Sequence, residues 1–201
     1  MKTLIIVDPQ IDFMPGGSLE VPKGNEIISV INQLIPKFDL IVATQDWHPA
    51  NHKSFASNNP GTTVFDTTDL NGTQQIMWPD HCIQGTKGSE FHPELNTHPI
   101  AAIFRKGMDV EVDSYSGFYD NNKANSTGLS GFLQEKGAKD LYFCGLAADV
   151  CVYFTLKDAL NEGFNVTLIE DGVRALDEKT FSNQKEKLLK QGAKITIGSK
   201  I

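Results

Sequence analysis

The chain has few cysteines, and its first residues do not predict a secretory leader. Its three cysteines are an odd number, so they cannot all pair within the chain. The apolar run at residues 4–7 follows Lys2, is too short for the apolar region of a signal peptide and is followed by Asp8. Because disulfides persist mainly in oxidising compartments, these features predict reduced thiols in a cytoplasmic protein.

Basic residues and long apolar runs are also scarce. Lysine and arginine number 18 against 25 aspartates and glutamates, which gives a formal net charge of -7. Such an acidic chain is poorly suited to binding nucleic acid or an anionic membrane. No apolar run approaches the about 20 residues that a membrane-spanning helix needs. These absences predict neither a nucleic-acid nor a membrane partner, and they leave a small-molecule ligand open.

Strand-type and helix-type segments alternate along the chain. Continuous apolar runs predict strands at residues 3–7, 40–43, 100–104, 141–144, 164–169 and 194–197. Helical spacing predicts helices at residues 25–35, 129–135 and 178–190, and another that begins at about residue 151. This alternation predicts a three-layer, doubly wound (Rossmann-like) α/β fold with a parallel sheet. Without a repeat or linker, residues 1–201 are expected to form one domain.

Residues 46–99 show little periodicity and are rich in asparagine, glycine, threonine and proline. A loop region this long in a compact domain is usually functional or disordered. Its candidate metal ligands are Asp46, His48, His52 and His81. One carboxylate and several imidazoles suit a divalent ion such as zinc, iron, manganese or cobalt, although surface histidines in a polar loop are the alternative. His92 and His98 have no ligand-type neighbours and are expected to be such surface residues.

Cys151 follows a strand and a glycine-containing turn, at the start of a helix-type segment. Free N–H groups at a helix start favour an anion, so this thiol is expected to have a lowered pKa unless it merely packs the helix onto the sheet. Asp8 and Lys106 end the first and third predicted strands, whose carboxyl ends share an edge of the sheet. Separately they could be a turn cap and a surface lysine. Together, a thiol, a carboxylate and an ammonium suit nucleophilic hydrolysis of an amide.

Six short motifs follow one another along the chain. They are IVDPQIDF at residues 6–13, TQDWHPANH at 44–52, WPDHC at 78–82, FRKG at 104–107, YSGF at 115–118 and GLAADVC at 145–151. In this order they closely resemble the nicotinamidase (pyrazinamidase) family of isochorismatase-like cysteine hydrolases. The Asp, Lys and Cys positions alone indicate only the superfamily. The metal-ligand cluster and the WPDHC motif single out the nicotinamidases.

The resemblance implies a role for each motif. It makes Asp8, Lys106 and Cys151 the catalytic triad, and Asp46, His48, His52 and His81 the ligands of one divalent metal ion. Phe13, Trp78 and Tyr115 would line the pocket for the substrate ring. A cis peptide bond at Leu146–Ala147 would aim the N–H groups of Ala147 and Cys151 at an oxyanion. The implied ion is zinc first, with iron or manganese accepted by the same ligands.

The implied reaction is hydrolysis of nicotinamide, and also of pyrazinamide, through a cysteine thioester in NAD salvage. One alternative is a relative that acts on a carbamoyl or ureido substrate. A second is a metallohydrolase in which metal-bound water attacks and Cys151 is structural. A third is a non-catalytic nucleotide-binding module, which is disfavoured because no Gly-x-Gly-x-x-Gly turn follows the first strand. The sequence does not determine the oligomeric state, and it is compatible with a homo-oligomer.

Overall fold

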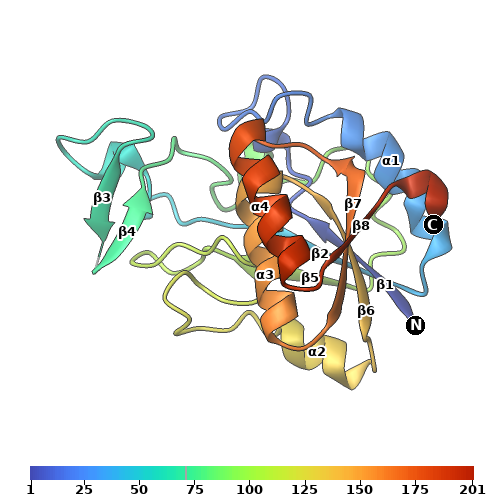
Figure 1. The fold of residues 1–201 in the computed structure, drawn as a ribbon. Coiled ribbons are helices and arrows are strands. Elements are labelled where there is room, and N and C mark those ends of the chain that lie inside the picture. Colours follow the sequence, from blue (N-terminus) through green and yellow to red (C-terminus); the bar gives the residue numbers. More distant parts are fainter. Residues whose placement is uncertain (71) are drawn as a thin grey trace.

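The computed structural model describes residues 1–70 and 72–201, and its centre is a sheet of six parallel strands (Figure 1). The strands are β1 (Lys2–Val7), β2 (Leu40–Asp46), β5 (Ala102–Lys106), β6 (Asp140–Gly145), β7 (Asn165–Val173) and β8 (Lys194–Thr196). Their order across the sheet is β5-β2-β1-β6-β7-β8. After β1, the chain adds β2 and β5 on one side of that strand. It then returns to add β6, β7 and β8 on the other side. Such a reversal creates a crevice at the carboxyl ends of the two central strands, β1 and β6.

Helices cover both faces of this sheet. Helix α1 (Glu26–Leu34) lies on one face, and α2 (Leu129–Glu135), α3 (Tyr153–Asn161) and α4 (Glu178–Lys190) lie on the other (Figure 1). Each face of the sheet has its own hydrophobic core, and successive residues of β1 point alternately into one core and the other. Leu4 and Ile6 pack in the core that contains α1, whereas Ile5 and Val7 pack in the other core, as the two-residue period of a strand requires. The predicted three-layer, doubly wound fold is confirmed.

Most predicted elements occur where they were expected. The bounds of α2 and α4 agree with the prediction, while β2 continues through Asp46 and β5 begins two residues later than predicted. Before α3, a π-type turn, Ala148–Val152, carries Cys151, so the helical segment begins earlier than expected. Of the helices in the described ranges, none has the length and apolar character needed to cross a bilayer.

A second, two-stranded antiparallel sheet lies within the region that showed no periodicity. It consists of β3 (Thr67–Leu70) and β4 (Thr73–Ile76), and it lies apart from the main sheet (Figure 1). Both strands are dominated by threonine, glutamine and aspartate, and each has only one aliphatic residue. Alternation of hydrophobic and polar residues is the main sequence signal for a strand, and neither strand shows it. The small sheet could therefore not be predicted from the sequence pattern.

Candidate active site

Four neighbouring strands deliver the predicted reactive residues to one edge of the sheet. Asp8 directly follows β1, Asp46 ends β2, Lys106 ends β5, and Cys151 lies in the turn after β6. All four side chains are buried. Asp8 has a φ of 45°, a left-handed conformation that is uncommon for residues other than glycine and that recurs at functional positions. The juxtaposition expected from the strand ends is therefore present.

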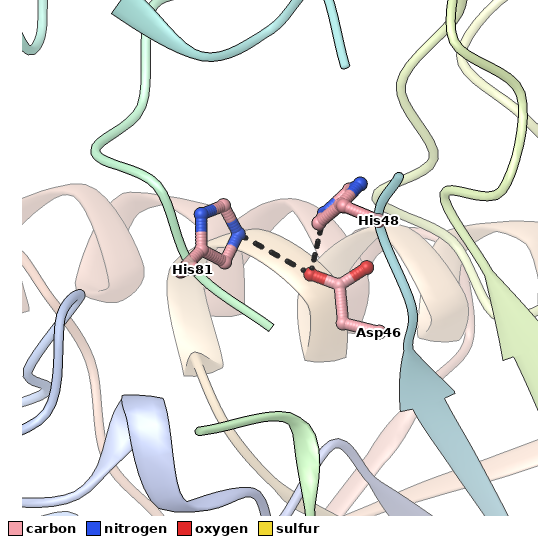
Figure 2. A group of neighbouring side chains, drawn as sticks. All are labelled: Asp46, His48 and His81. Atoms are coloured by element: carbon pink, nitrogen blue, oxygen red, sulfur yellow. Dashed lines mark ion pairs between the residues drawn. The ribbon is translucent and has the colours of Figure 1, made fainter. Parts of the chain in front are cut away.

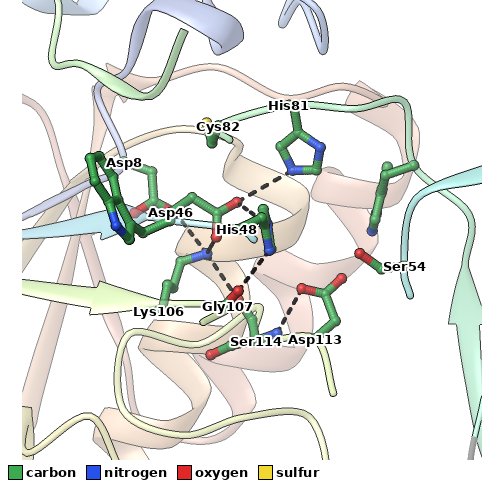
Figure 3. Close-up of polar contacts among 12 residues, drawn as sticks. Asp8, Asp46, His48, Ser54, His81, Cys82, Lys106, Gly107, Asp113 and Ser114 are labelled. Carbon is green, nitrogen blue, oxygen red and sulfur yellow. Dashed lines mark hydrogen bonds and ion pairs between the residues drawn. The ribbon is translucent and has the colours of Figure 1, made fainter. Parts of the chain in front are cut away.

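Lys106 contacts each of the other three residues of this cluster. Its Nζ lies 3.0 Å from Oδ2 of Asp8 and 3.0 Å from Oδ1 of Asp46 (Figure 3). The same atom is 3.3 Å from Sγ of Cys151 and donates a hydrogen bond of 2.9 Å to the carbonyl of Ser114. Burial alone lowers the pKa of Lys106, but Asp46 and Asp8 outweigh burial and hold that pKa well above its usual value. The lysine is therefore a permanent ammonium between two carboxylates.

The Cys151 thiol does not have the lowered pKa that its place before a helix predicted. Burial raises the pKa of this thiol well above its usual value, although the Lys106 ammonium opposes the change. The negative charges of Asp8 and Asp46 raise it further. The expectation was wrong because burial and two carboxylates outweigh one ammonium and a helix start. The resting cysteine is a thiol and needs a proton acceptor before it can attack.

Asp8 is placed to be that acceptor. Burial raises the pKa of the Asp8 carboxyl, against the opposing effect of Lys106. A raised carboxyl pKa brings the group nearer to neutral pH, where a general base and acid works best. The hydroxyl of Thr44 donates a hydrogen bond of 2.6 Å to Oδ1 of Asp8 and holds the carboxylate in one orientation.

Asp46, His48 and His81 converge beside this cluster (Figure 2). Nε2 of His48 lies 3.0 Å from Oδ2 of Asp46, and Nε2 of His81 lies 3.4 Å from the same oxygen. Nδ1 of His48 faces the carbonyl of Gly107 at 2.9 Å, and Nδ1 of His81 faces that of Pro79 at 2.7 Å. Because a carbonyl only accepts, each neutral ring carries its proton on Nδ1 and turns the lone pair of Nε2 toward Asp46.

This arrangement fits a divalent cation. Two nitrogen lone pairs and a carboxylate point at one another, and a positive ion between them would satisfy all three. Burial alone raises the pKa of Asp46, but His48 and Lys106 outweigh it and hold that pKa well below the usual range, so Asp46 is ionised. Burial lowers the pKa of His48, yet the negative charge of Asp46 outweighs burial and raises it. The site attracts positive charge.

His52 does not join the other three expected ligands. It groups instead with His48 and Asp113. Nδ1 of His52 faces Ser54, whose backbone N–H donates to it at 3.1 Å and whose Oγ lies 2.7 Å away. Burial lowers the pKa of His52, with His48 adding to the effect, which keeps the ring neutral. Nε2 of His52 is buried and has no hydrogen-bond partner among the described residues.

A cavity opens over the thiol and the metal-type cluster. It is lined by all three aromatic residues expected to hold a substrate ring, Phe13, Trp78 and Tyr115. Cys151, Asp46 and His81 line the same cavity, as does Ala147. The peptide bond Leu146–Ala147 is cis, as the resemblance implied. A flat aromatic ring in this cavity would therefore meet aromatic walls, the thiol and two of the metal-type ligands.

Three polar residues of the site were missed by sequence reasoning. Thr44 orients Asp8 as described above. Gln10 fixes the backbone of Asp46: its Oε1 accepts from the Asp46 N–H at 2.8 Å, and its Nε2 donates to the Asp46 carbonyl at 2.7 Å. Asp113 lines the cavity and is buried. Thr44 lies within β2 near its end and Gln10 lies shortly after β1, which could have indicated them, whereas Asp113 lies in a polar stretch that offered no signal.

Comparisons with known proteins agree with this geometry. Residues 2–198 match the model of the Isochorismatase domain family. The nicotinamidase of Acinetobacter baylyi is 48% identical over 174 residues, which are 87% of this chain and 81% of that protein. A solved Acinetobacter baumanii nicotinamidase is 42% identical with a TM-score of 0.96, and the match covers 99% of this chain and 97% of that one.

A solved Pyrococcus horikoshii pyrazinamidase in complex with zinc is also similar. It is 37% identical, the match covers 98% of each chain, and the TM-score is 0.82. Both the family match and the relatives extend over most of the chain, which includes every motif of the site. The chain therefore belongs to the isochorismatase family and, within it, to the nicotinamidases.

Proposed function

We propose that this chain hydrolyses nicotinamide to nicotinate and ammonia, the deamidation used in NAD salvage, and that it also accepts pyrazinamide. The observation that carries the proposal is one aromatic-walled cavity lined by the Cys151 thiol and by Asp46 and His81 of the metal-type cluster, with the Lys106 ammonium 3.3 Å from the thiol. High identity to nicotinamidases along most of the chain supports the same substrate. The reaction is an amide hydrolysis that needs no redox cofactor.

Cys151, Asp8 and Lys106 carry out the bond changes. As Sγ of Cys151 attacks the carboxamide carbon, its proton passes to Asp8, and the Lys106 ammonium stabilises the charge that develops on sulfur. Asp8 then gives the proton to the departing ammonia, which leaves a thioester on Cys151. A water molecule that loses its proton to Asp8 attacks the thioester, nicotinate leaves, and the proton returns to sulfur. Ala147 and Cys151, which both line the cavity, supply backbone N–H groups for the oxyanion.

Asp46, His48 and His81 would hold one divalent ion in this proposal. Such an ion would supply Lewis acidity toward the nitrogen of the substrate ring. We propose zinc, with iron or manganese as ions that the same ligands accept. His52 is left out of the set because it groups with His48 and Asp113 and not with Asp46 and His81. Phe13, Trp78 and Tyr115 enclose the ring. The free, buried cysteines accord with a reducing cytoplasm as the place of the reaction.

The test is ammonia release from nicotinamide by the purified protein. It is run on the protein as isolated, after a chelator, and after single metals are restored. Turnover that the chelator removes and one metal restores is the expected result. No ammonia under any condition, from protein shown to be folded by circular dichroism, would refute the proposal. Carbamoyl and ureido compounds run in parallel would then identify a different amide substrate.

A further inference from the structure

Gln75 is the one residue of β4 whose side chain is buried. It is 2% exposed, whereas Gln74 and Ile76 on either side of it are exposed. The small sheet to which it belongs lies apart from the main sheet (Figure 1), so burial of a polar side chain there requires contacts with the rest of the site.

The amide nitrogen of Gln75 faces three oxygen atoms. It lies 3.0 Å from Oδ2 of Asp113, 2.8 Å from the hydroxyl of Tyr115 and 2.8 Å from the carbonyl of Ile76. A carboxylate and a carbonyl only accept hydrogen bonds, so the nitrogen and not the oxygen of the amide must point this way. The amide oxygen in turn accepts from Nδ2 of Asn121 at 3.4 Å. One side chain therefore fixes two residues of the cavity wall.

Tyr115 links Gln75 to a second aromatic residue of the cavity, Trp78. The Tyr115 hydroxyl also accepts a hydrogen bond of 3.2 Å from Nε1 of Trp78, and the two rings meet edge to face with their centres 6.0 Å apart. Tyr115, Trp78 and Asp113 all line the cavity. Gln75 is thus bonded to a carboxylate and a phenol of that wall, and the phenol is bonded to the indole.

We propose that Gln75 is a positioning residue that sets the shape of the ring pocket from the small sheet. The inference rests on the proposed function, because it assigns a role in binding the same aromatic amide. The reacting groups Asp8, Lys106 and Cys151 lie at the carboxyl edge of the main sheet and are not bonded to Gln75 in the described part of the chain. Loss of Gln75 therefore weakens binding of the ring more than it slows the chemistry, which raises KM with little change in kcat.

The experiment compares four variants with the wild-type enzyme in the same metal-loaded state. Gln75→Met keeps the length of the side chain and removes its hydrogen bonds, and Gln74→Met is the matched control on the exposed face of the same strand. Tyr115→Phe keeps the ring and removes the hydroxyl, and the fourth variant combines it with Gln75→Met. KM and kcat for nicotinamide are measured together with the Kd of nicotinate by calorimetry, a readout that does not depend on turnover.

For Gln75→Met we expect KM and the nicotinate Kd to rise about tenfold, with kcat within about threefold of the wild type. Tyr115→Phe should show the same pattern, and the double variant should be no worse than Gln75→Met, because both changes break one network. Gln74→Met should match the wild type. The inference is overturned if Gln75→Met behaves like Gln74→Met, or if the two single effects multiply in the double variant.

Two further outcomes are distinguishable. If Gln75→Met fails to fold in a thermal melt, Tyr115→Phe alone decides, and an unchanged KM and Kd in that variant would overturn the inference. If the wild-type enzyme releases no ammonia from nicotinamide, the proposed function fails and this inference fails with it. Wild-type turnover with unaffected variants, by contrast, refutes only the role of Gln75.

Discussion

Nζ of Lys106 and Sγ of Cys151 lie 3.3 Å apart, and both side chains are almost wholly buried. An ammonium in this position cannot accept the thiol proton, because it holds its own protons tightly. It can stabilise the sulfur anion once the proton has moved to Asp8. The pair therefore explains how a thiol with a raised pKa can still serve as a nucleophile.

Replacing the nucleophile should remove nearly all activity and leave the rest of the site intact. For Cys151→Ala we expect at least about a thousandfold loss of kcat in ammonia release, with the metal content unchanged by mass spectrometry. Cys144→Ala is the control, since Cys144 is buried in β6 and does not line the cavity. It should keep wild-type turnover. Near-normal turnover in Cys151→Ala would instead mean that water attacks the amide without the thiol.

The raised thiol pKa should be visible in alkylation. Only the thiolate reacts with iodoacetamide, and the pKa of Cys151 lies well above its usual value of 9.0. The rate at Cys151, followed by peptide mass spectrometry, should therefore rise about tenfold per pH unit from pH 7 to pH 9. A rate that levels off below about pH 8 would show a lowered pKa and contradict the structure.

Asp8→Asn should separate reactivity from turnover. The negative charge of Asp8 raises the pKa of the Cys151 thiol, so removing that charge lowers the thiol pKa and increases the thiolate fraction at a given pH. Alkylation at pH 7 should become faster while ammonia release falls by at least about a hundredfold, because the proton acceptor is gone. Slower alkylation in this variant would show that Asp8 activates the resting thiol directly.

The strand ends explain why so much of the site could be predicted. Strands buried on both faces read as continuous apolar runs, as at β1 and β2, and parallel strands must bring their carboxyl ends to one edge. The sequence alone could therefore predict that Asp8, Asp46 and Lys106 lie close together. The candidate metal ligands came from the polar loop and the pocket aromatics from the resemblance, and the structure gathers all but His52 at the expected place.

The features that escaped prediction depend on tertiary surroundings. The thiol pKa of Cys151 is set by burial and by carboxylates from other strands, which a local helix-start argument does not include. His52 groups with Asp113, a residue distant in the sequence, and not with Asp46 and His81, which its place in the motif did not indicate. Asp113 and Gln75 gain their positions only when the small sheet packs against the cavity wall. None of these contacts produces a periodic pattern in the amino-acid sequence from which it could be predicted.

The histidines provide a direct test of the ligand set. His81→Ala removes a nitrogen that faces Asp46 and should weaken metal binding by at least about a hundredfold, measured as metal retained after dialysis against graded chelator. His52→Ala should retain its metal within about tenfold of the wild type, because His52 groups with His48 and Asp113 and not with Asp46 and His81. His98→Ala, at an exposed histidine, is the control. Equal metal loss in His52→Ala and His81→Ala would restore the four-ligand set.

Gly107→Ala should damage the metal-type cluster through backbone geometry alone. Gly107 has a φ of 66°, and a Cβ added there would lie 2.7 Å from Nδ1 of His48, closer than atoms can approach. The carbonyl of Gly107 also accepts from that nitrogen, so His48 cannot move away without losing the bond that orients it. Metal affinity and turnover should therefore both fall by at least about tenfold.

Gly137→Ala separates this collision from the strain of the left-handed backbone. Gly137 has a φ of 68°, and a Cβ added there would meet nothing within 4 Å. Both substitutions should lower the free energy of unfolding by about 1 kcal/mol for the unfavourable φ, measured in urea on the metal-free proteins. Only Gly107→Ala should also lose metal and activity. If both variants keep full metal affinity, His48 is not held in place by Gly107, and the orientation assigned to its ring would have to be revised.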